Sequence, residues 1–138
     1  MKGPASPAGQ EELFERSAAQ PARREPLEPG AFVLRAFASD EAPALLDRIH
    51  GVAQQAPFRR MTTARGLMSV AMTNCGEAGW LSDRRGYRYD AIDSETQRPW
   101  PELPDALAEL ARWAGGAARF DGFVPNACLI NRYEPGRD

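Results

Sequence analysis

The sequence predicts one α+β domain in which helices and strands occupy separate stretches of the chain. Two stretches, at about residues 40–55 and 105–114, repeat apolar residues at helical spacing. Three others, residues 31–37, 68–73 and 127–133, carry the short apolar or alternating runs that are typical of strands. With 138 residues the chain is long enough to bury one hydrophobic core, and we expect a single domain.

The N-terminal segment differs in composition from the rest of the chain. Residues 1–26 are rich in Pro, Ala, Gly, Glu and Gln and poor in large apolar side chains. Such a segment cannot bury enough apolar surface to offset its conformational entropy, so we expect a flexible tail. Within the tail, residues 11–16 (EELFER) have the pattern of one helical turn whose Leu13 and Phe14 dock on the body.

The first helix is expected to begin at Ser39 or Asp40, because either side chain suits an N-cap. It runs to about Gln55 and ends before Pro57. His50 lies beside its apolar face and is the only histidine of the chain, so no second histidine completes a metal site and we assign it no chemistry. The residues of the apolar face are Leu45, Ile49, Val52 and Ala53.

The stretch at 68–89, MSVAMTNCGEAGWLSDRRGYRY, interleaves a β-pattern with aromatic rings and arginines. The alternation of residues 68–73 predicts a strand that breaks at 74–76 and again at 78–79. The chain then resumes through Trp80 to an Arg-Arg-Gly turn and a Tyr-x-Tyr pair. Such a surface is suited to binding a nucleic-acid strand. It equally suits an ordinary hairpin, which composition by itself favours.

The C-terminal third begins with a connection at 90–104 that contains three prolines and predicts an extended loop. Trp100 stands between two prolines, outside any regular helix, and is expected to pin the loop onto the core. A second helix is expected from Asp105 until Gly115-Gly116 ends it. The run at 127–133 is short enough to be a buried strand.

Charge, cysteine content and hydropathy restrict the class of protein. The formal net charge of -2 means that any nucleic-acid site must be a local patch. Cys75 and Cys128 lie far apart in no metal-ligand spacing, which predicts two reduced thiols of a cytosolic protein. The sequence contains neither a long apolar run nor a signal-peptide core, so we expect a soluble, cytoplasmic protein with no membrane partner.

Three motifs, in this order and spacing, resemble the AlkB family of iron(II)- and 2-oxoglutarate-dependent dioxygenases, which remove alkyl lesions from nucleic-acid bases. They are MSVAMTNCG at 68–76, GW followed by GYRY within 79–89, and ACLINRYEPG at 127–136. The segment PWP at 99–101 fits the same template. The resemblance covers about Leu27 to the end and is closest to the bacterial branch of the family.

The resemblance implies a double-stranded β-helix, a jelly-roll barrel preceded by a nucleotide-recognition lid. Residues 27–138 would be the N-terminal part of that domain, with the lid and first strands present and the barrel incomplete in this chain. On this template the lid spans about 58–90, and a strand that binds the co-substrate spans about 127–133.

The resemblance also implies roles for five residues. Asn131 and Tyr133 would hydrogen-bond the co-substrate 2-oxoglutarate, a task that an amide and a phenol hydroxyl suit. Trp80 would stack on the flipped damaged base, Met72 would line the same pocket, and Tyr87 would reach the nucleic-acid backbone. The substrate would be alkylated single-stranded DNA or RNA, and a cationic alkylated base would gain a cation–π interaction with Trp80.

The arginines in and beside the lid admit two interpretations. They would supply charge that faces the phosphates, or they form an ordinary solvated hairpin face that nearby carboxylates offset. The carboxylates are Glu77, Asp83 and Asp90. The arginines are Arg59, Arg60, Arg65, Arg84, Arg85 and Arg88.

The iron site is the main departure from the family pattern. Enzymes of this type hold iron with two histidines and one carboxylate, and His50 cannot form that set. The family's His-x-Asp motif would follow shortly after Asn131-Arg132-Tyr133. We therefore expect this chain to be the N-terminal portion of an enzyme that is monomeric when intact, to contain no metal ligand and no catalytic residue, and to be inactive alone.

Two other functions remain open from the sequence. The chain would be a non-catalytic module that binds single-stranded nucleic acid, or an inert truncated product. In every case the strand at 127–133 would expose an edge and an apolar face, so we expect residues 1–138 alone to be marginally stable or prone to aggregation.

Overall fold

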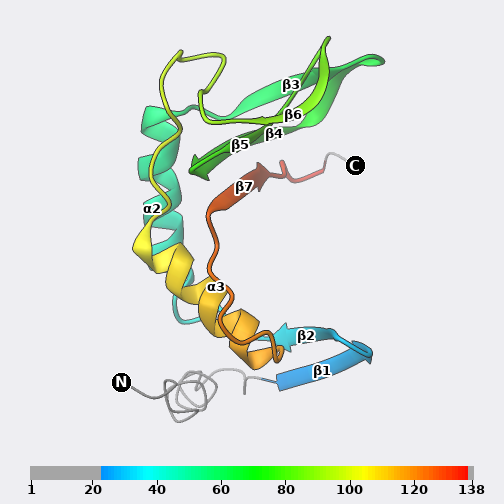
Figure 1. The fold of residues 1–138 in the computed structure, drawn as a ribbon, viewed down its shortest axis with the longest axis vertical. Coiled ribbons are helices and arrows are strands. Elements are labelled where there is room, and N and C mark those ends of the chain that lie inside the picture. The colour runs from blue at the N-terminus through cyan, green and yellow to red at the C-terminus, as the bar shows by residue number, and fades with distance from the viewer. Residues whose placement is uncertain (1–22, 137–138) are drawn as a thin grey trace. The chain divides into compact units, whose positions relative to one another are not determined.

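The computed structural model describes residues 23–136. These residues form two compact units (Figure 1). Among the described residues, one unit comprises residues 23–46 and Ala106–Val124, and the other comprises Asp47–Asp105 and residues 125–136. The described residues combine helices with antiparallel strand pairs, which confirms a mixed helix and strand architecture, and residues 23–136 contain no closed barrel. No helix among these residues has the length and apolar character needed to cross a bilayer.

The first unit contains an antiparallel hairpin of strand β1 (Arg23–Glu28) and strand β2 (Ala31–Arg35). The chain reverses at Gly30, whose φ of 81° lies in the left-handed region that glycine adopts without strain. Strand β1 occupies the last residues of the predicted tail, because Arg24 anchors it through a hydrogen bond of 2.8 Å to the carbonyl of Ala117. The remainder of that tail, including Leu13 and Phe14, lies outside the described residues.

Helix α3 (Asp105–Ala117) forms the core of the first unit with the segment that follows β2. The helix continues through Gly115-Gly116, so the predicted end at these glycines is wrong. A Cβ on Gly115 would lie 3.1 Å from the Cβ of Phe123, so the glycine allows the following segment to pack closely against the helix. The core residues are Phe37 and Ala117, with Leu34, Leu110, Trp113 and Ala114 packed against them.

Helix α2 (Ala42–Gln55) ends two residues before Pro57, as predicted. Its first residues belong to the first unit and the remainder to the second. Val52 is buried, and Leu45, Ile49 and Ala53 are half-buried, so the predicted apolar face is the face that packs. Beyond the helix, the buried hydroxyl of Thr73 donates a hydrogen bond of 2.6 Å to the carbonyl of Ala56.

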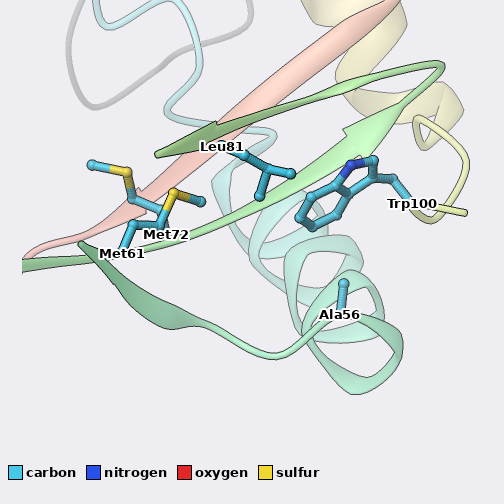
Figure 2. Close-up of a cluster of buried hydrophobic side chains, with 5 residues drawn as sticks. All are labelled: Ala56, Met61, Met72, Leu81 and Trp100. Carbon is cyan, nitrogen blue, oxygen red and sulfur yellow. The ribbon is translucent and has the colours of Figure 1, made fainter. Parts of the chain in front are cut away.

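The second unit contains a three-stranded antiparallel sheet in the order β3-β4-β7 and a separate β5-β6 hairpin (Figure 1). The strands of the sheet are β3 (Arg59–Thr63), β4 (Gly66–Gly76) and β7 (Ala127–Arg132). The hairpin consists of β5 (Gly79–Asp83) and β6 (Gly86–Asp90), and it turns at the predicted Arg-Arg-Gly segment. Figure 2 shows the core between them, which comprises Ala56, Met61, Met72, Leu81 and Trp100.

In this unit one strand was not predicted and two predictions about strands are wrong. The sequence did not predict strand β3, which pairs with β4 through a register irregularity after Arg60. The predicted break at 74–76 is wrong, because β4 continues to Gly76 and Asn74 and Cys75 are buried within it. Strand β7 is not buried either, because it is an edge strand of its sheet and Leu129 is 42% exposed, and this confirms the exposed edge predicted for residues 127–133.

The loop at 91–104 is held by its tryptophan, as predicted. Trp100 is buried in the core, and its indole Nε1 donates a hydrogen bond of 2.9 Å to the carbonyl of Asp90. The guanidinium of Arg59 lies 5.1 Å from the centre of the indole and makes two hydrogen bonds, of 2.6 and 2.7 Å, to the buried carboxylate of Asp93. Ring, arginine and carboxylate together fix the loop against β3.

Candidate functional site

The position of Trp80 is set by Asn74, which lies near the end of the neighbouring strand. The side-chain Nδ2 of Asn74 donates to the carbonyl of Trp80, and its Oδ1 accepts from the backbone N–H of Trp80, both at 3.0 Å. Asn74 is 1% exposed, so no water competes for these bonds. Because the two bonds imitate a pair of ladder hydrogen bonds, they hold the start of β5 against β4 although the two strands belong to different sheets.

Close packing around Gly79 restrains the same turn. A Cβ on Gly79 would collide with the indole of Trp100 and would lie 2.8 Å from the Cβ of Asn74. Only glycine therefore lets β5 begin at this point. Gly76, at the other end of the turn, has φ +112° and lies against the backbone of Asn126 and Ala127.

The ring of Trp80 packs against the core cluster that contains Met72, and it is half-buried. The ring of Tyr87 stacks on it, with the ring centres 5.6 Å apart and an angle of 27° between the planes. Tyr89 lies directly opposite Trp80 in the β5–β6 register, and Tyr87 and Tyr89 are 72% and 70% exposed. Directly opposed residues of an antiparallel pair project to the same face, so one face of the hairpin carries three aromatic side chains.

The β4–β7 register aligns residues that the sequence assigned to two different ligands. Met72 stands directly opposite Asn131, so both side chains project from the same face of the sheet. The amide Nδ2 of Asn131 donates to the hydroxyl of Tyr133 at 3.3 Å, and both residues are exposed. Met72 is buried in the core of the unit, whereas Asn131 and Tyr133 are exposed.

The arginines of strands β3 to β6 and their turns divide into two groups. Arg59 is committed to Asp93 and Glu95, and Arg88 pairs with Asp83 at 2.8 Å, so neither supplies unpaired charge. The hydrogen bond from Arg88 is the main cause that lowers the pKa of Asp83, and the N–H of Arg85 acts in the same direction. Arg88 therefore fits the interpretation of a hairpin face offset by nearby carboxylates, whereas Arg59 fits neither interpretation, because its side chain is only 11% exposed and pairs with Asp93.

The other group of arginines lies at the tips of the two hairpins and beside them. The hydroxyl of Ser82, late in β5, donates to the carbonyl of Thr62, late in β3, at 2.7 Å. The β3–β4 turn and the β5–β6 turn are therefore neighbours at one end of the unit, as Figure 1 shows. Arg65, Arg84 and Arg85 in these turns are exposed, and within residues 23–136 they form no ion pair. Arg60 is also exposed, and its Nε donates to the carbonyl of Met68.

The side chains present do not suit an iron centre. The part of the chain that the structure describes contains no group of three or more His, Cys, Asp or Glu side chains able to hold a metal ion. His50 lies exposed on α2. We therefore derive no catalytic step through iron from these residues.

Sequence reasoning missed the role of Asn74, although a signal was present. Asn74 continues the alternation of Met68, Val70 and Met72, which places it on the inward face of β4. A polar side chain on an inward face requires buried hydrogen-bond partners. The adjacent Cys75-Gly76 predicts a break in the strand instead.

The chain matches the 2OG-Fe(II) oxygenase superfamily over residues 30–138. The alpha-ketoglutarate-dependent dioxygenase AlkB of Salmonella typhimurium is 56% identical over 114 residues, which cover 82% of this chain and 53% of the relative. The protein of the same name from Escherichia coli is 51% identical over the same shares. An AlkB homolog from Caulobacter vibrioides is 46% identical over 94 residues, which cover 67% of this chain and 41% of the relative.

These matches, together with the three motifs, show that the chain belongs to the 2OG-Fe(II) oxygenase superfamily and, within it, to the AlkB family. The family predicted from those motifs is confirmed. The superfamily is defined by Fe(II) and 2-oxoglutarate, which agrees with the predicted cofactors. The chain spans about half the length of the curated relatives it matches.

Proposed function

We propose that this chain is the N-terminal portion of a cytoplasmic dioxygenase of the AlkB type, which oxidatively removes alkyl groups from bases of single-stranded DNA or RNA. One observation carries the proposal: Trp80, locked by Asn74, lies against the cluster containing Met72, and Met72 stands opposite Asn131. A residue suited to stack on a base and a residue suited to bind 2-oxoglutarate thus belong to adjacent elements of one unit.

The lid would bind the extruded base through the aromatic face of the β5–β6 hairpin. An indole face restores part of the stacking that the base loses when it leaves the helix, worth about 1–3 kcal/mol per base. The Asn74 bonds keep the indole in place before the base arrives, so base binding loses little side-chain entropy at Trp80. Tyr87 extends the stacked surface and is 72% exposed, so it would reach the sugar-phosphate backbone.

Asn131 and Tyr133 suit the co-substrate. Asn131 Nδ2 donates one N–H to the hydroxyl of Tyr133 at 3.3 Å, and both residues are exposed. The second amide N–H and the phenol O–H remain to donate to a carboxylate or keto oxygen that binds beside the pair. When bound, Fe(II), O2 and 2-oxoglutarate supply the oxidation of the alkyl carbon, and the base is released with loss of an aldehyde. The jelly-roll barrel that would hold the iron is part of the proposal, because residues 23–136 do not form it.

The exposed arginines at the two hairpin tips would bind phosphates. Arg65, Arg84 and Arg85 form a local basic patch in a chain of net charge -2. Phosphate contacts release counterions, and this binding should therefore weaken steeply with salt.

The proposal is tested by titrating labelled single-stranded DNA with the protein at low salt. We expect saturable binding that Trp80→Ala weakens about tenfold or more, which corresponds to the loss of one stacking contact. Phe120→Ala, which removes a 56% exposed ring from the other unit, is the matched control and should leave the affinity unchanged. No saturable binding, or equal loss in both variants, would contradict the proposed lid and favour an inert product.

A non-catalytic binding module predicts the same titration but no turnover by the complete gene product. The two functions separate when that gene product is supplied with Fe(II), 2-oxoglutarate and an alkylated oligonucleotide. Repair of the base supports the dioxygenase, and tight binding without repair supports the module.

A further inference from the structure

The two cysteines, which are far apart in the sequence, face each other across the sheet. Cys75 of β4 and Cys128 of β7 are direct partners in the antiparallel register, and both are free thiols. Cys75 is fully buried, whereas Cys128 is only partly covered because β7 is an edge strand. Neither thiol takes part in the proposed dealkylation.

The hydrogen bonds beside the pair fix its spacing. Glu77 N–H donates to the carbonyl of Asn126 at 2.8 Å, whereas Gly76 N–H turns away to the carbonyl of Pro101. Antiparallel pairs alternate between bonded and non-bonded, so Cys75 and Cys128, two positions from the bonded Glu77–Asn126 pair, form a bonded pair. The Cα atoms of such a pair lie about 5.5 Å apart, which is within the range that a disulfide spans.

The two thiols also differ in reactivity. A hydrogen bond from Cys75 lowers the pKa of Cys128 to about 7, although burial acts in the opposite direction. The pKa of Cys75 is raised far above its ordinary value, first by its hydrogen bond with Cys128 and then by burial. Near neutral pH a substantial fraction of Cys128 is therefore thiolate, which is the nucleophilic form, next to a protonated Cys75.

We propose that Cys75 and Cys128 are a peroxide-reactive site that closes into a reversible disulfide between β4 and β7. The partly exposed Cys128 thiolate attacks one oxygen of a hydroperoxide. The S–O bond forms, the O–O bond breaks, and the Cys128 sulfur is oxidised to a sulfenic acid while an alcohol or water leaves. The sulfur of Cys75 then attacks Cys128, so that the S–S bond forms and the S–O bond breaks.

The overall reaction balances. Two thiols and one hydroperoxide give one disulfide, one alcohol (or water, from hydrogen peroxide) and one further water, which carries away the Cys75 proton. Cys75 becomes the better nucleophile in the second step, because the thiolate that raised its pKa no longer exists once Cys128 is oxidised. A thiol such as glutathione reverses the bond by exchange, as expected for a transient disulfide of a reducing compartment.

The cross-link would act on the edge of the sheet. Asn131 and its partner Met72 lie three register positions from the cysteines on the same two strands. A disulfide ties the edge strand to its neighbour and restricts the unfolded chain, so the oxidised protein should unfold at a higher denaturant concentration.

The test is to treat the protein with equimolar hydrogen peroxide and map its peptides by mass spectrometry. We expect a peptide pair joining Cys75 to Cys128, lighter by two hydrogen atoms than the separate thiols, that dithiothreitol releases. Oxidation should accelerate as the pH rises through about 7. The denaturant midpoint should rise on oxidation and return on reduction.

Single variants identify the order of the two steps. Cys75→Ser should stop at a Cys128 sulfenic acid that dimedone traps, and Cys128→Ser should leave Cys75 as an unmodified thiol under the same treatment. Disulfides that join two protein molecules, or unchanged thiols in the wild-type protein, would overturn the proposal. A failure of nucleic-acid binding would not bear on it, because the cysteine chemistry is measured without substrate.

Discussion

The side-chain amide of Asn74 bonds both main-chain groups of Trp80, each at 3.0 Å. One buried amide therefore replaces a missing ladder between β4 and β5. Trp80, which would touch the base, is therefore held by Asn74, which would touch no ligand.

Replacing Asn74 by alanine should lower the free energy of unfolding by more than the cavity alone would. The change leaves the N–H and the carbonyl of Trp80 without their partner, and each unsatisfied group costs about 1–3 kcal/mol. We expect the free energy of unfolding in urea to fall by about 2–4 kcal/mol and single-stranded DNA affinity to fall with it. Ser69→Ala, an exposed change on the same strand, should alter neither. Equal stability of both variants would show that Asn74 does not position Trp80.

Two glycines in the second unit should respond oppositely to alanine. Gly79→Ala places a Cβ inside the Trp100 indole and should destabilise the protein by about 1–3 kcal/mol. Gly51→Ala fills open space in the interior of α2 and should stabilise it by about 0.5–1 kcal/mol, because alanine loses less entropy in a helix. Thermal or urea unfolding measures both. A neutral Gly79→Ala would mean that the start of β5 can move away from Trp100.

The ion pair of Arg59 and Asp93 predicts how stability depends on pH. Burial by itself would raise the pKa of Asp93, but the hydrogen bonds from Arg59 and from the Glu95 N–H outweigh it, and the net shift is downward. A lowered carboxyl pKa stabilises the folded state above the ordinary Asp value of about 3.9. That contribution is lost as the pH falls through the lower folded pKa.

Asp93→Asn tests this pH dependence. At pH 7 we expect a loss of about 3–5 kcal/mol, because Arg59 keeps a buried charge without its main partner. The difference from wild type should shrink below about pH 4. Glu134→Gln, which removes an exposed partner of Arg132, should cost under about 1 kcal/mol at any pH. A difference that stays constant down to acid pH would contradict the assignment to Asp93.

The hairpin tips predict a salt effect. In the double variant Arg84→Ala and Arg85→Ala, the slope of log affinity against log salt should fall by about 0.7 for each lost contact with a single-stranded phosphate. Arg48→Ala, an exposed arginine on α2, should leave the slope unchanged. Equal slopes in wild type and double variant would assign the tips to ordinary solvated turns.

The sequence predicted best those elements whose signals are local. The helix that ends before Pro57, the turn between β5 and β6, and the burial of Trp100 between two prolines all follow from the residues themselves. The family followed from three short motifs. The predicted roles of Trp80 and Asn131 came from that resemblance, and the titration above tests the first.

The sequence could not predict features that depend on contacts between distant residues. Strand β1 is anchored by the carbonyl of Ala117, and Phe123 packs closely against Gly115 of α3. The sequence makes Arg59 a candidate phosphate ligand, but in the fold its guanidinium bonds the carboxylate of Asp93. None of these partners is near its counterpart in sequence, so no local pattern could reveal them.

The most direct test of the proposed function measures turnover by the complete gene product. With Fe(II), 2-oxoglutarate and an oligonucleotide that carries one methylated adenine, we predict one aldehyde released for each base repaired. Trp80→Ala and Asn131→Ala should each lower kcat/KM by tenfold or more, whereas Phe120→Ala should not. Repair that is unaffected by Trp80→Ala, or no repair by the wild-type enzyme, would contradict the assignment of this chain to the substrate-binding half of a nucleic-acid dealkylase.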